Sequence, residues 1–214
     1  MMEISNSYEL FVWLKSQDLL ENSPPYWWPN HNTFEVVVGA ILTQNTKWQN
    51  VEKSLKNIKD FLDDDIKVEN LMAIPNYALS ALIAPSGFNN QKSSRLLQLG
   101  NNIFEEFGDF KSFCANVDRD WLLKQKGIGQ ESADAILCYA CGKEEMVVDK
   151  YTAKLLNKFG YEFESYDDIK SWLLAGVNEN FDKIQAIYEY DISLNEIYAT
   201  FHGKIVELSK RKIV

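Results

Sequence analysis

Apolar residues recur at helical spacing along almost the whole chain, and the alternating pattern of a half-buried strand is scarce. Leu10, Phe11 and Leu14 show this spacing near the N-terminus. Side chains three and four positions apart lie on one face of a helix, whereas a strand turns every second side chain to the same face. The sequence therefore predicts an all-α fold.

The predicted helices are joined by short polar or glycine-containing turns. They cover residues 6–20, 33–44, 48–62, 76–84, 90–107, 118–125, 130–141, 150–158, 166–175 and 182–211. A break in the last segment, between Asn180 and Ser193, is left open. The chain has 214 residues, which is enough for one large domain or two small ones with a substantial core.

The net charge of the chain is −9, with 22 Lys and Arg against 31 Asp and Glu. A negative total argues against a polyanionic partner such as nucleic acid. The acidic residues are clustered, however. Residues 161–196 carry a net charge of −7 and residues 59–69 a net charge of −3, so the remaining 167 residues carry +1. A basic contact surface beside acidic helices is therefore compatible with the composition.

Cysteine content and the N-terminus indicate a cytoplasmic protein with no membrane association. The three cysteines, Cys114, Cys138 and Cys141, do not make a disulfide framework, and an odd number is typical of a reducing compartment. The N-terminus lacks the basic start and apolar stretch of a signal peptide, and the longest apolar run, residues 36–42, is too short to span a bilayer. We interpret the Cys138-x-x-Cys141 spacing as two thiols packed in a helix, not as a metal site.

Residues 24–29 read Pro-Pro-Tyr-Trp-Trp-Pro and do not fit a plain helical bundle. The prolines restrict the backbone to an extended, rigid loop. Aromatic rings held in this way can form a platform for a flat ligand. They can equally fill a gap between helices, and both interpretations of Trp27 and Trp28 stay open here.

A helix-hairpin-helix pattern occupies about residues 119–140. A short amphipathic helix stops at Gly127, Ile128 and Gly129, and a second helix begins immediately afterwards. The glycines allow a tight turn around one buried apolar residue and leave amide N–H groups exposed at a helix N-terminus. Such donors, together with the positive end of the helix dipole, favour binding of a phosphate.

The ordered set of motifs resembles the helix-hairpin-helix DNA glycosylases related to endonuclease III. The diagnostic run is the hairpin, the helix that follows it from Ser132, and the segment Val147-Val148-Asp149. The resemblance extends upstream and covers most of residues 33–158. It implies a two-domain all-α fold with the active site in the interdomain cleft. A six-helix barrel domain would span 33–145, and a second domain would be built from 1–32 plus 146–214.

Within this superfamily the chain is most similar to the 3-methyladenine DNA glycosylases. Trp27, Trp28 and Pro29, together with Trp48, match the base pocket of that branch, and the C-terminal region carries Phe-His-Gly-Lys in place of cysteines. The resemblance implies an enzyme that excises alkylated purines from double-stranded DNA in base excision repair. Because such bases are cationic, stacked aromatic rings would select them through cation–π attraction.

The resemblance identifies Asp149 as the catalytic residue. A carboxylate there would stabilise the oxocarbenium-like sugar and orient or deprotonate water. Asp149 also suits the N-cap of the helix that follows it, and the two roles are compatible. Bifunctional relatives carry a lysine two positions after the second hairpin glycine, whereas this chain has Glu131. A carboxylate cannot form the Schiff base, so we expect a monofunctional glycosylase without AP lyase activity.

The remaining expected DNA contacts follow from family position. Gln44 would fill the space left by the flipped base, and Phe88 would act as a wedge in the opposite strand. Alternatively, Gln44 is an amide that bonds the backbone, and Phe88 simply packs its loop. The hairpin residues Gly127, Ile128 and Gly129 and the basic Lys210 would contact phosphates. We expect a monomer acting on DNA in the bacterial cytosol or nucleoid.

No cofactor is expected. An iron–sulfur cluster needs four cysteine ligands near the C-terminus, and no cysteine follows Cys141. Relatives without the cluster suggest instead that Lys204 is carbamylated by carbon dioxide and ties the C-terminal segment together. Two alternative functions remain: a glycosylase for oxidised or mismatched bases, and a non-catalytic helix-hairpin-helix DNA-binding protein. The presence of Asp149 at the catalytic position argues against the second alternative.

Overall fold

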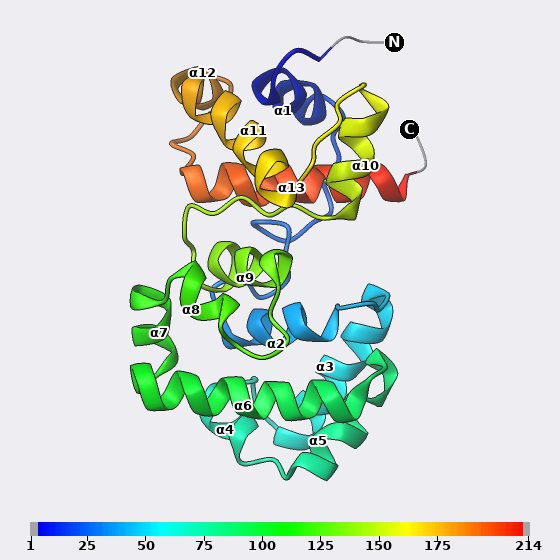
Figure 1. The fold of residues 1–214 in the computed structure, drawn as a ribbon, viewed down its shortest axis with the longest axis vertical. Helices are drawn as coiled ribbons and strands as arrows, with labels where there is room; N and C mark the ends of the chain where they lie inside the picture. The colour runs from blue at the N-terminus through cyan, green and yellow to red at the C-terminus, as the bar shows by residue number, and fades with distance from the viewer. Residues whose placement is uncertain (1–3, 212–214) are drawn as a thin grey trace. The chain divides into compact units, whose positions relative to one another are not determined.

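The computed structural model describes residues 4–211, and these residues form helices and no strands, which confirms the all-α prediction. They contain thirteen α-helices, a 3-10 turn and a π-helical turn (Figure 1). The chain divides into two compact units. Residues 30–142 make up the central unit, and residues 1–29 with 143–214 make up the terminal unit.

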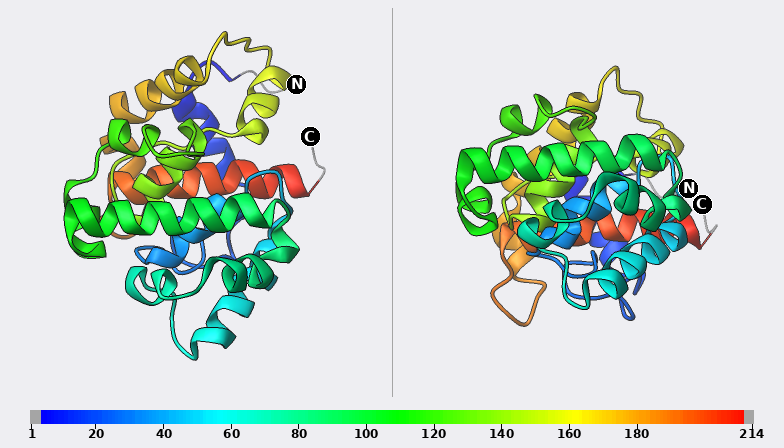
Figure 2. Two further views of the ribbon diagram at one scale, coloured as in Figure 1. Left: turned by 60° about the horizontal axis from the view of Figure 1, so that its bottom comes forward. Right: turned by 90° about the horizontal axis from the view of Figure 1, so that it is seen from below.

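The central unit is built around one helix that is buried along its whole length. Its helices are α2 (Phe34–Leu42), α3 (Trp48–Leu62), α4 (Val68–Met72), α5 (Asn76–Leu82), η1 (Ala84–Ser86), α6 (Asn89–Phe107), α7 (Phe110–Asn116), α8 (Arg119–Leu123), α9 (Gln130–Ala135) and η2 (Ile136–Ala140). All residues of α2 are buried, and α3, α6, α9 and η2 pack around it. A helix that is apolar on all sides must be enclosed in this way. The long α6, drawn in green, runs across the central unit in Figure 2.

The terminal unit brings the two ends of the chain into one core. It contains α1 (Ser7–Lys15), α10 (Lys150–Lys158), α11 (Tyr166–Glu179), α12 (Phe181–Gln185) and α13 (Leu194–Lys210). α13 packs against both α1 and α10 (Figure 1). The rings of Phe11 and Phe201 meet edge to face at 5.3 Å in this core. One face of α13 is thereby fixed against helices from both ends of the sequence.

Several helix limits differ from the predicted ones. The first helix ends at Lys15 instead of continuing to residue 20, and Asp18 has a φ of 46°. The last predicted segment is broken into α12 and α13. Two short helices, α4 and α7, lie where none was predicted. Each offers only one or two turns of periodicity, and α7 depends on a cap in which Asp109 accepts a hydrogen bond from the Ser112 amide.

Among residues 4–211, none of the helices combines the length and the apolar character that a membrane span requires.

Candidate functional site

Asp149 is the N-cap of α10, as the sequence predicts. Its Oδ1 accepts hydrogen bonds from the amide (2.8 Å) and the hydroxyl (2.9 Å) of Thr152. The Thr152 hydroxyl oxygen also faces the Asp149 amide at 3.5 Å, which completes a capping box. The preceding residues, Met146, Val147 and Val148, are buried and anchor the approach to the cap. The carboxylate is therefore held by one oxygen, and Oδ2 remains available for other contacts.

His202 lies beside that second oxygen. Its Nε2 is 3.6 Å from Asp149 Oδ2, and only 5% of the His202 side chain and 10% of the Asp149 side chain are exposed. Burial raises the pKa of Asp149, but the hydrogen-bonding and charge interactions with His202 and the hydrogen bonds from Thr152 outweigh it and hold the pKa below its usual value. Asp149 is therefore ionised at neutral pH despite its burial.

Trp27 is fixed by the same face of α13 that carries His202. Its Nε1 donates a hydrogen bond to Glu207 Oε1 (2.9 Å), and its ring meets the His202 imidazole edge to face at 5.2 Å. Lys210 pairs with the same Glu207 oxygen at 2.7 Å, and its ammonium lies 5.8 Å from the centre of the indole. Gly203 makes this packing possible, because a Cβ there would lie 2.4 Å from Trp27 Cγ. α13 therefore positions His202 beside Asp149, and it holds the Trp27 ring against His202 and against the ion pair of Glu207 with Lys210.

The proline-rich loop turns more sharply than its composition predicts. Tyr26 and Trp27 have φ values of 59° and 68°, and the Trp27 amide donates a hydrogen bond to the Pro24 carbonyl. The expectation of an extended loop is therefore wrong at these two residues. Non-glycine residues adopt this conformation only when their surroundings impose it, and the contacts of Trp27 with α13 supply that constraint. Trp28 is buried, whereas Trp27 and Pro29 are half-buried.

The other predicted site residues belong to the central unit. Trp48 is the first residue of α3 and is half-buried. The Gln44 amide donates hydrogen bonds to the Gly127 carbonyl (2.9 Å) and the Ser132 hydroxyl (3.0 Å). Phe88 is 65% exposed and has a φ of 47°. Gln44 therefore bonds the hairpin in this structure, and the Phe88 ring is not packed into its loop.

The hairpin forms between α8 and α9, with Ile128 buried in the turn. Gly127 has a φ of 83° and requires glycine, whereas Gly129 has a φ of −100° that any residue can adopt, so the expected need for two glycines holds only at Gly127. A Cβ on Gly127 would lie 2.5 Å from the Nε atom of Arg95, which reaches over the turn from α6.

The two hairpin helices are joined by an ion pair in which Arg119 Nε lies 2.8 Å from Asp134 Oδ1. Since the Asp134 side chain is fully buried, this pair fixes the angle at which α9 leaves the turn.

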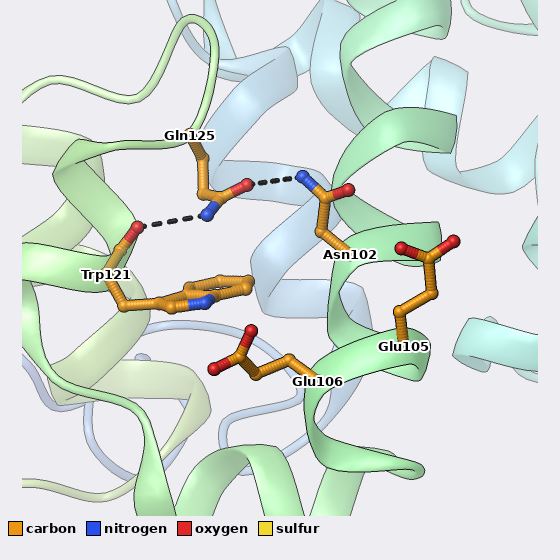
Figure 3. A pocket seen from close by; sticks show the side chains of 5 residues that line it. All are labelled: Asn102, Glu105, Glu106, Trp121 and Gln125. Atoms are coloured by element: carbon orange, nitrogen blue, oxygen red, sulfur yellow. Dashed lines mark hydrogen bonds between the residues drawn. The ribbon is translucent and has the colours of Figure 1, made fainter.

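A cavity of about 230 Å³ lies between α6 and the end of α8 (Figure 3). Asn102, Glu105, Glu106, Trp121 and Gln125 line it. The Asn102 amide donates to Gln125 Oε1 (2.6 Å), and Gln125 Nε2 donates to the Trp121 carbonyl (3.0 Å). These bonds fasten the first hairpin helix to α6. The two carboxylates make this part of the surface unfavourable for a phosphate.

Lys204 is buried in the terminal unit and faces a second cavity. Its ammonium lies 4.8 Å from the centre of the Phe11 ring. Burial and the nearby Lys15 lower the pKa of Lys204 to about 7, although Glu196 acts in the opposite direction. The cavity has a volume of about 250 Å³, and Lys15, Glu196 and Lys204 line it together with Thr200. Asp18 and Glu21 line it as well, so two lysines share this space with three carboxylates.

Within the part of the chain that the structure describes, no group of three or more His, Cys, Asp or Glu side chains could hold a metal ion. Cys138 is buried in η2, in the second hairpin helix.

Sequence reasoning did not assign a role to His202, Thr152 or Glu207. His202 offered one usable signal, because the chain has only two histidines and this one stands between a phenylalanine and a glycine in a helix.

Comparisons with known proteins agree on one family. The model of the HhH-GPD superfamily of base excision DNA repair proteins matches residues 38–178. The chain is 36% identical over 194 residues to the provisionally assigned DNA repair glycosylase MJ1434 of Methanocaldococcus jannaschii, over 86% of this chain and 80% of that protein.

Two solved structures share the fold. The crystal structure of Helicobacter pylori 3-methyladenine DNA glycosylase (MagIII) bound to 1,N6-ethenoadenine matches with a TM-score of 0.95 and 51% identity, covering 98% of this chain and all of that one. A trapped covalent intermediate of endonuclease III with DNA matches with a TM-score of 0.69 and 16% identity, over 95% of this chain and 85% of that one. The second likeness concerns the fold alone.

Proposed function

Because the chain belongs to the HhH-GPD superfamily of base excision DNA repair proteins, we propose that it is a monofunctional DNA glycosylase that excises alkylated purines, 3-methyladenine foremost. The observation that carries this proposal is the buried, ionised Asp149 in one cluster with His202 and the Trp27 ring. The nearly full-length similarity to the H. pylori 3-methyladenine DNA glycosylase supports the choice of substrate class.

Asp149 supplies the negative charge that the reaction needs. As the glycosidic bond breaks, the sugar becomes an oxocarbenium-like cation and the base leaves with the bonding electrons. A carboxylate held in a low-dielectric site stabilises such a cation more strongly than it would in water. Oδ1 is occupied by Thr152, so Oδ2 is the oxygen that faces the sugar or orients the attacking water. Water then adds to the sugar carbon and loses its proton, which leaves an abasic site.

Alkylated purines suit this site because they already carry a positive charge. An alkyl group at N3 or N7 weakens the glycosidic bond, so the leaving base needs little protonation. The face of the Trp27 ring attracts a cation by roughly 0.5–2 kcal/mol. Lys210 lies over the same ring, but Glu207 neutralises its charge. By family position, Trp28 and Pro29 of the terminal unit and Trp48 of the central unit are proposed to contribute to recognition of the base.

DNA binding is proposed to use groups of the central unit, together with Lys210 of the terminal unit. Phe88 projects from its loop and acts as the wedge, while Gln44 fills the space left by the flipped base. The amides of Gly127 and Gly129 bind a phosphate, whereas the Ile128 amide donates to the Gln125 carbonyl (3.2 Å) and holds the turn between them. Lys210, whose side chain is 53% exposed, releases Glu207 and binds a second phosphate. The protein works as a monomer on double-stranded DNA in the bacterial cytoplasm.

The absence of lyase activity is proposed from Glu131, the second residue of α9. A carboxylate at this position cannot attack the sugar to form an imine. Borohydride would therefore trap no covalent adduct between the protein and damaged DNA, and a trapped adduct would overturn this part of the proposal.

Carbamylation of Lys204 is supported by its surroundings. A lysine with a pKa of about 7 is largely neutral near physiological pH, so its nitrogen attacks carbon dioxide, an N–C bond forms and one proton is released. The new carboxylate would pair with Lys15, which lines the same cavity. Intact mass spectrometry in bicarbonate buffer should show the addition of one carbon dioxide, and Lys204→Arg should abolish it. An unmodified wild-type protein under saturating bicarbonate would contradict this proposal.

The main test is incubation with duplex DNA that carries methylated purines, followed by chromatography of the released bases. We expect release of 3-methyladenine, and a loss of about 100-fold or more in single-turnover rate for Asp149→Asn, which keeps the Thr152 contacts but removes the charge. Release of oxidised or mismatched bases instead would favour the first alternative activity. No release from any damaged duplex would leave only a DNA-binding function.

A further inference from the structure

Lys92, in the first turn of α6, is buried although its side chain carries a charge. It is 2% exposed, and lysines are almost never buried so completely unless their charge is paired. Among residues 4–211, no carboxylate pairs with its ammonium. Instead, the three N–H groups of Nζ are shared among four oxygens within hydrogen-bond distance: the carbonyls of Leu42 (2.7 Å), Gln44 (3.0 Å) and Ser86 (2.9 Å) and the hydroxyl of Thr46 (3.1 Å).

These oxygens come from two separate loops. Leu42, Gln44 and Thr46 belong to the end of α2 and the loop that follows it, whereas Ser86 ends η1, two residues before Phe88. The Thr46 hydroxyl donates a further hydrogen bond to the Ser86 carbonyl. Lys92 therefore joins the loop that carries Gln44 to the loop that carries Phe88.

Each loop contains one residue in a backbone conformation that needs support from surrounding contacts. Asn45 and Phe88 have φ values of 53° and 47°, a region that non-glycine residues seldom adopt. Such conformations persist where surrounding contacts over-determine them, and they cluster at functional sites. Here the contacts are the bonds to Lys92, since its ammonium draws oxygens from both loops to a single point.

We propose that Lys92 is a positioning residue that holds Gln44 and Phe88 at a fixed spacing, so that both side chains enter the duplex together when the base is flipped. The inference rests on the proposed function, because it takes Gln44 and Phe88 as the DNA-invading residues. An apolar side chain of equal length would leave four oxygens converging on a buried space with no donor, and this arrangement is unfavourable.

The charge state of Lys92 allows a second test of its role. Burial, with a smaller contribution from Arg95, lowers the pKa of Lys92 to about 8. The elements packed against it, α2, the loop after α2 and η1, present carbonyls and one hydroxyl to its ammonium, and Arg95 is the charged neighbour on its own helix. Deprotonation above that pH removes one donor and the charge, so the spacing of the two loops loosens.

The test monitors the DNA and does not depend on base release. A duplex carries an abasic-site analogue, and 2-aminopurine stands in the opposite strand, where insertion of Phe88 unstacks it and raises its fluorescence. For Lys92→Met we expect the amplitude of this rise to fall at least about fivefold and single-turnover excision about 100-fold. Affinity for undamaged duplex should change less than about threefold, because the hairpin is intact.

Two controls separate positioning from charge and from folding. Lys111→Met removes one exposed lysine on α7 and should leave the fluorescence amplitude unchanged. Lys92→Arg keeps a charged donor and should restore part of the amplitude. If Lys92→Met loses no amplitude, or if Lys111→Met loses as much, the proposal is wrong.

Wild-type protein decides the question if Lys92→Met does not fold. Its fluorescence amplitude should decline as the pH rises through about 8, with circular dichroism unchanged, whereas Lys92→Arg should show no decline. A constant wild-type amplitude across this range contradicts the proposal. A protein that gives the full fluorescence response but releases no base would instead refute the proposed glycosylase activity and leave the role of Lys92 standing.

Discussion

In the terminal unit the candidate catalytic groups are side chains packed against one another along α13, whereas in the central unit the groups proposed to meet DNA are exposed loop residues and backbone amides. Asp149 and His202 are almost fully buried, and Trp27 is held by Glu207, His202 and Gly203 of α13. Phe88 is largely exposed, and Gly127 in the hairpin turn is exposed as well.

The difference reflects two kinds of chemistry. Selecting a cationic base and stabilising a cationic sugar require fixed charges and rings in a site with little water, so each side chain must be held by others. Binding a duplex requires exposed groups that can reach the DNA. Their side chains cannot be fixed by packing, so residues such as Lys92 and Arg95 fix the backbone of the loops and the hairpin that carry them. Substitutions in the terminal unit should therefore act on the chemical step, and those in the central unit on DNA binding or on the insertion of side chains into the duplex that precedes excision.

Gly203→Ala should have the largest effect. The added Cβ would lie 2.4 Å from Cγ and 2.6 Å from Cβ of Trp27, so the indole must move as a whole. We expect destabilisation of about 1–3 kcal/mol and a fall of about 100-fold or more in excision, since displacement of a positioning group by about 1 Å can cost that much. Gly129→Ala is the matched control, because a Cβ there meets nothing within 4 Å. Thermal melts and single-turnover kinetics measure both effects, and wild-type rates for Gly203→Ala would contradict the packing argument.

His202→Phe should have the second-largest effect, and this effect should depend on pH. The phenyl ring retains the contact with Trp27 but removes the two interactions with His202 that lower the pKa of Asp149. Only the hydrogen bonds from Thr152 then oppose burial, so the pKa rises. Because protonated Asp149 is inactive, the acid limb of the excision profile should move to higher pH. At pH 7 the rate should fall about tenfold, as expected for loss of a charge-assisted contact. In His202→Gln the acid limb of the excision profile should lie between those of wild type and His202→Phe. If the acid limb stays at the wild-type pH in both variants, this role for His202 is excluded.

The site residues that could be predicted from the sequence lie in short continuous motifs. Asp149 follows an apolar pair, and the hairpin lies within one short stretch, so local pattern and family resemblance were enough to propose them. His202, Glu207 and Lys92 act through contacts with residues far away in the chain, and no local pattern encodes such contacts. The sequence also suggested an extended loop around Trp27, because the contacts with α13 that impose a turn there are tertiary.

The helical content was predictable for the same reason. Long amphipathic segments such as 48–62 and 90–107 contain several turns of periodicity, and α3 and α6 follow them closely. α4 and α7 are too short to show a period, and their formation depends on caps and neighbours. The early end of α1 at Lys15 reflects a turn of the chain that the apolar Leu19 and Leu20 conceal.

Gly127→Ala tests the central unit and should affect DNA binding more than catalysis. Alanine is strained at a φ of 83°, and its Cβ would displace the Arg95 side chain from the turn. We expect affinity for undamaged duplex to fall about five- to tenfold, with the rate at saturating enzyme within about threefold of wild type. Fluorescence anisotropy and single-turnover kinetics separate the two quantities. A larger loss in rate than in affinity would contradict the proposal that the hairpin serves mainly to bind the duplex.

Glu207→Gln should have the smallest effect. It tests whether Glu207 supports Trp27 through its hydrogen bond or through its charge. The glutamine carbonyl can still accept the hydrogen bond from Trp27 Nε1, but the ion pair with Lys210 is lost. Because Lys210 is half-exposed, that pair contributes less than about 1 kcal/mol to stability. Excision of a cationic base should fall no more than about threefold, since Lys210 then stands over the ring uncompensated. Glu207→Ala removes the acceptor as well and should cost clearly more. Equal losses of excision rate in the two variants would show that the charge of Glu207, and not its hydrogen bond with the indole, supports recognition of the base.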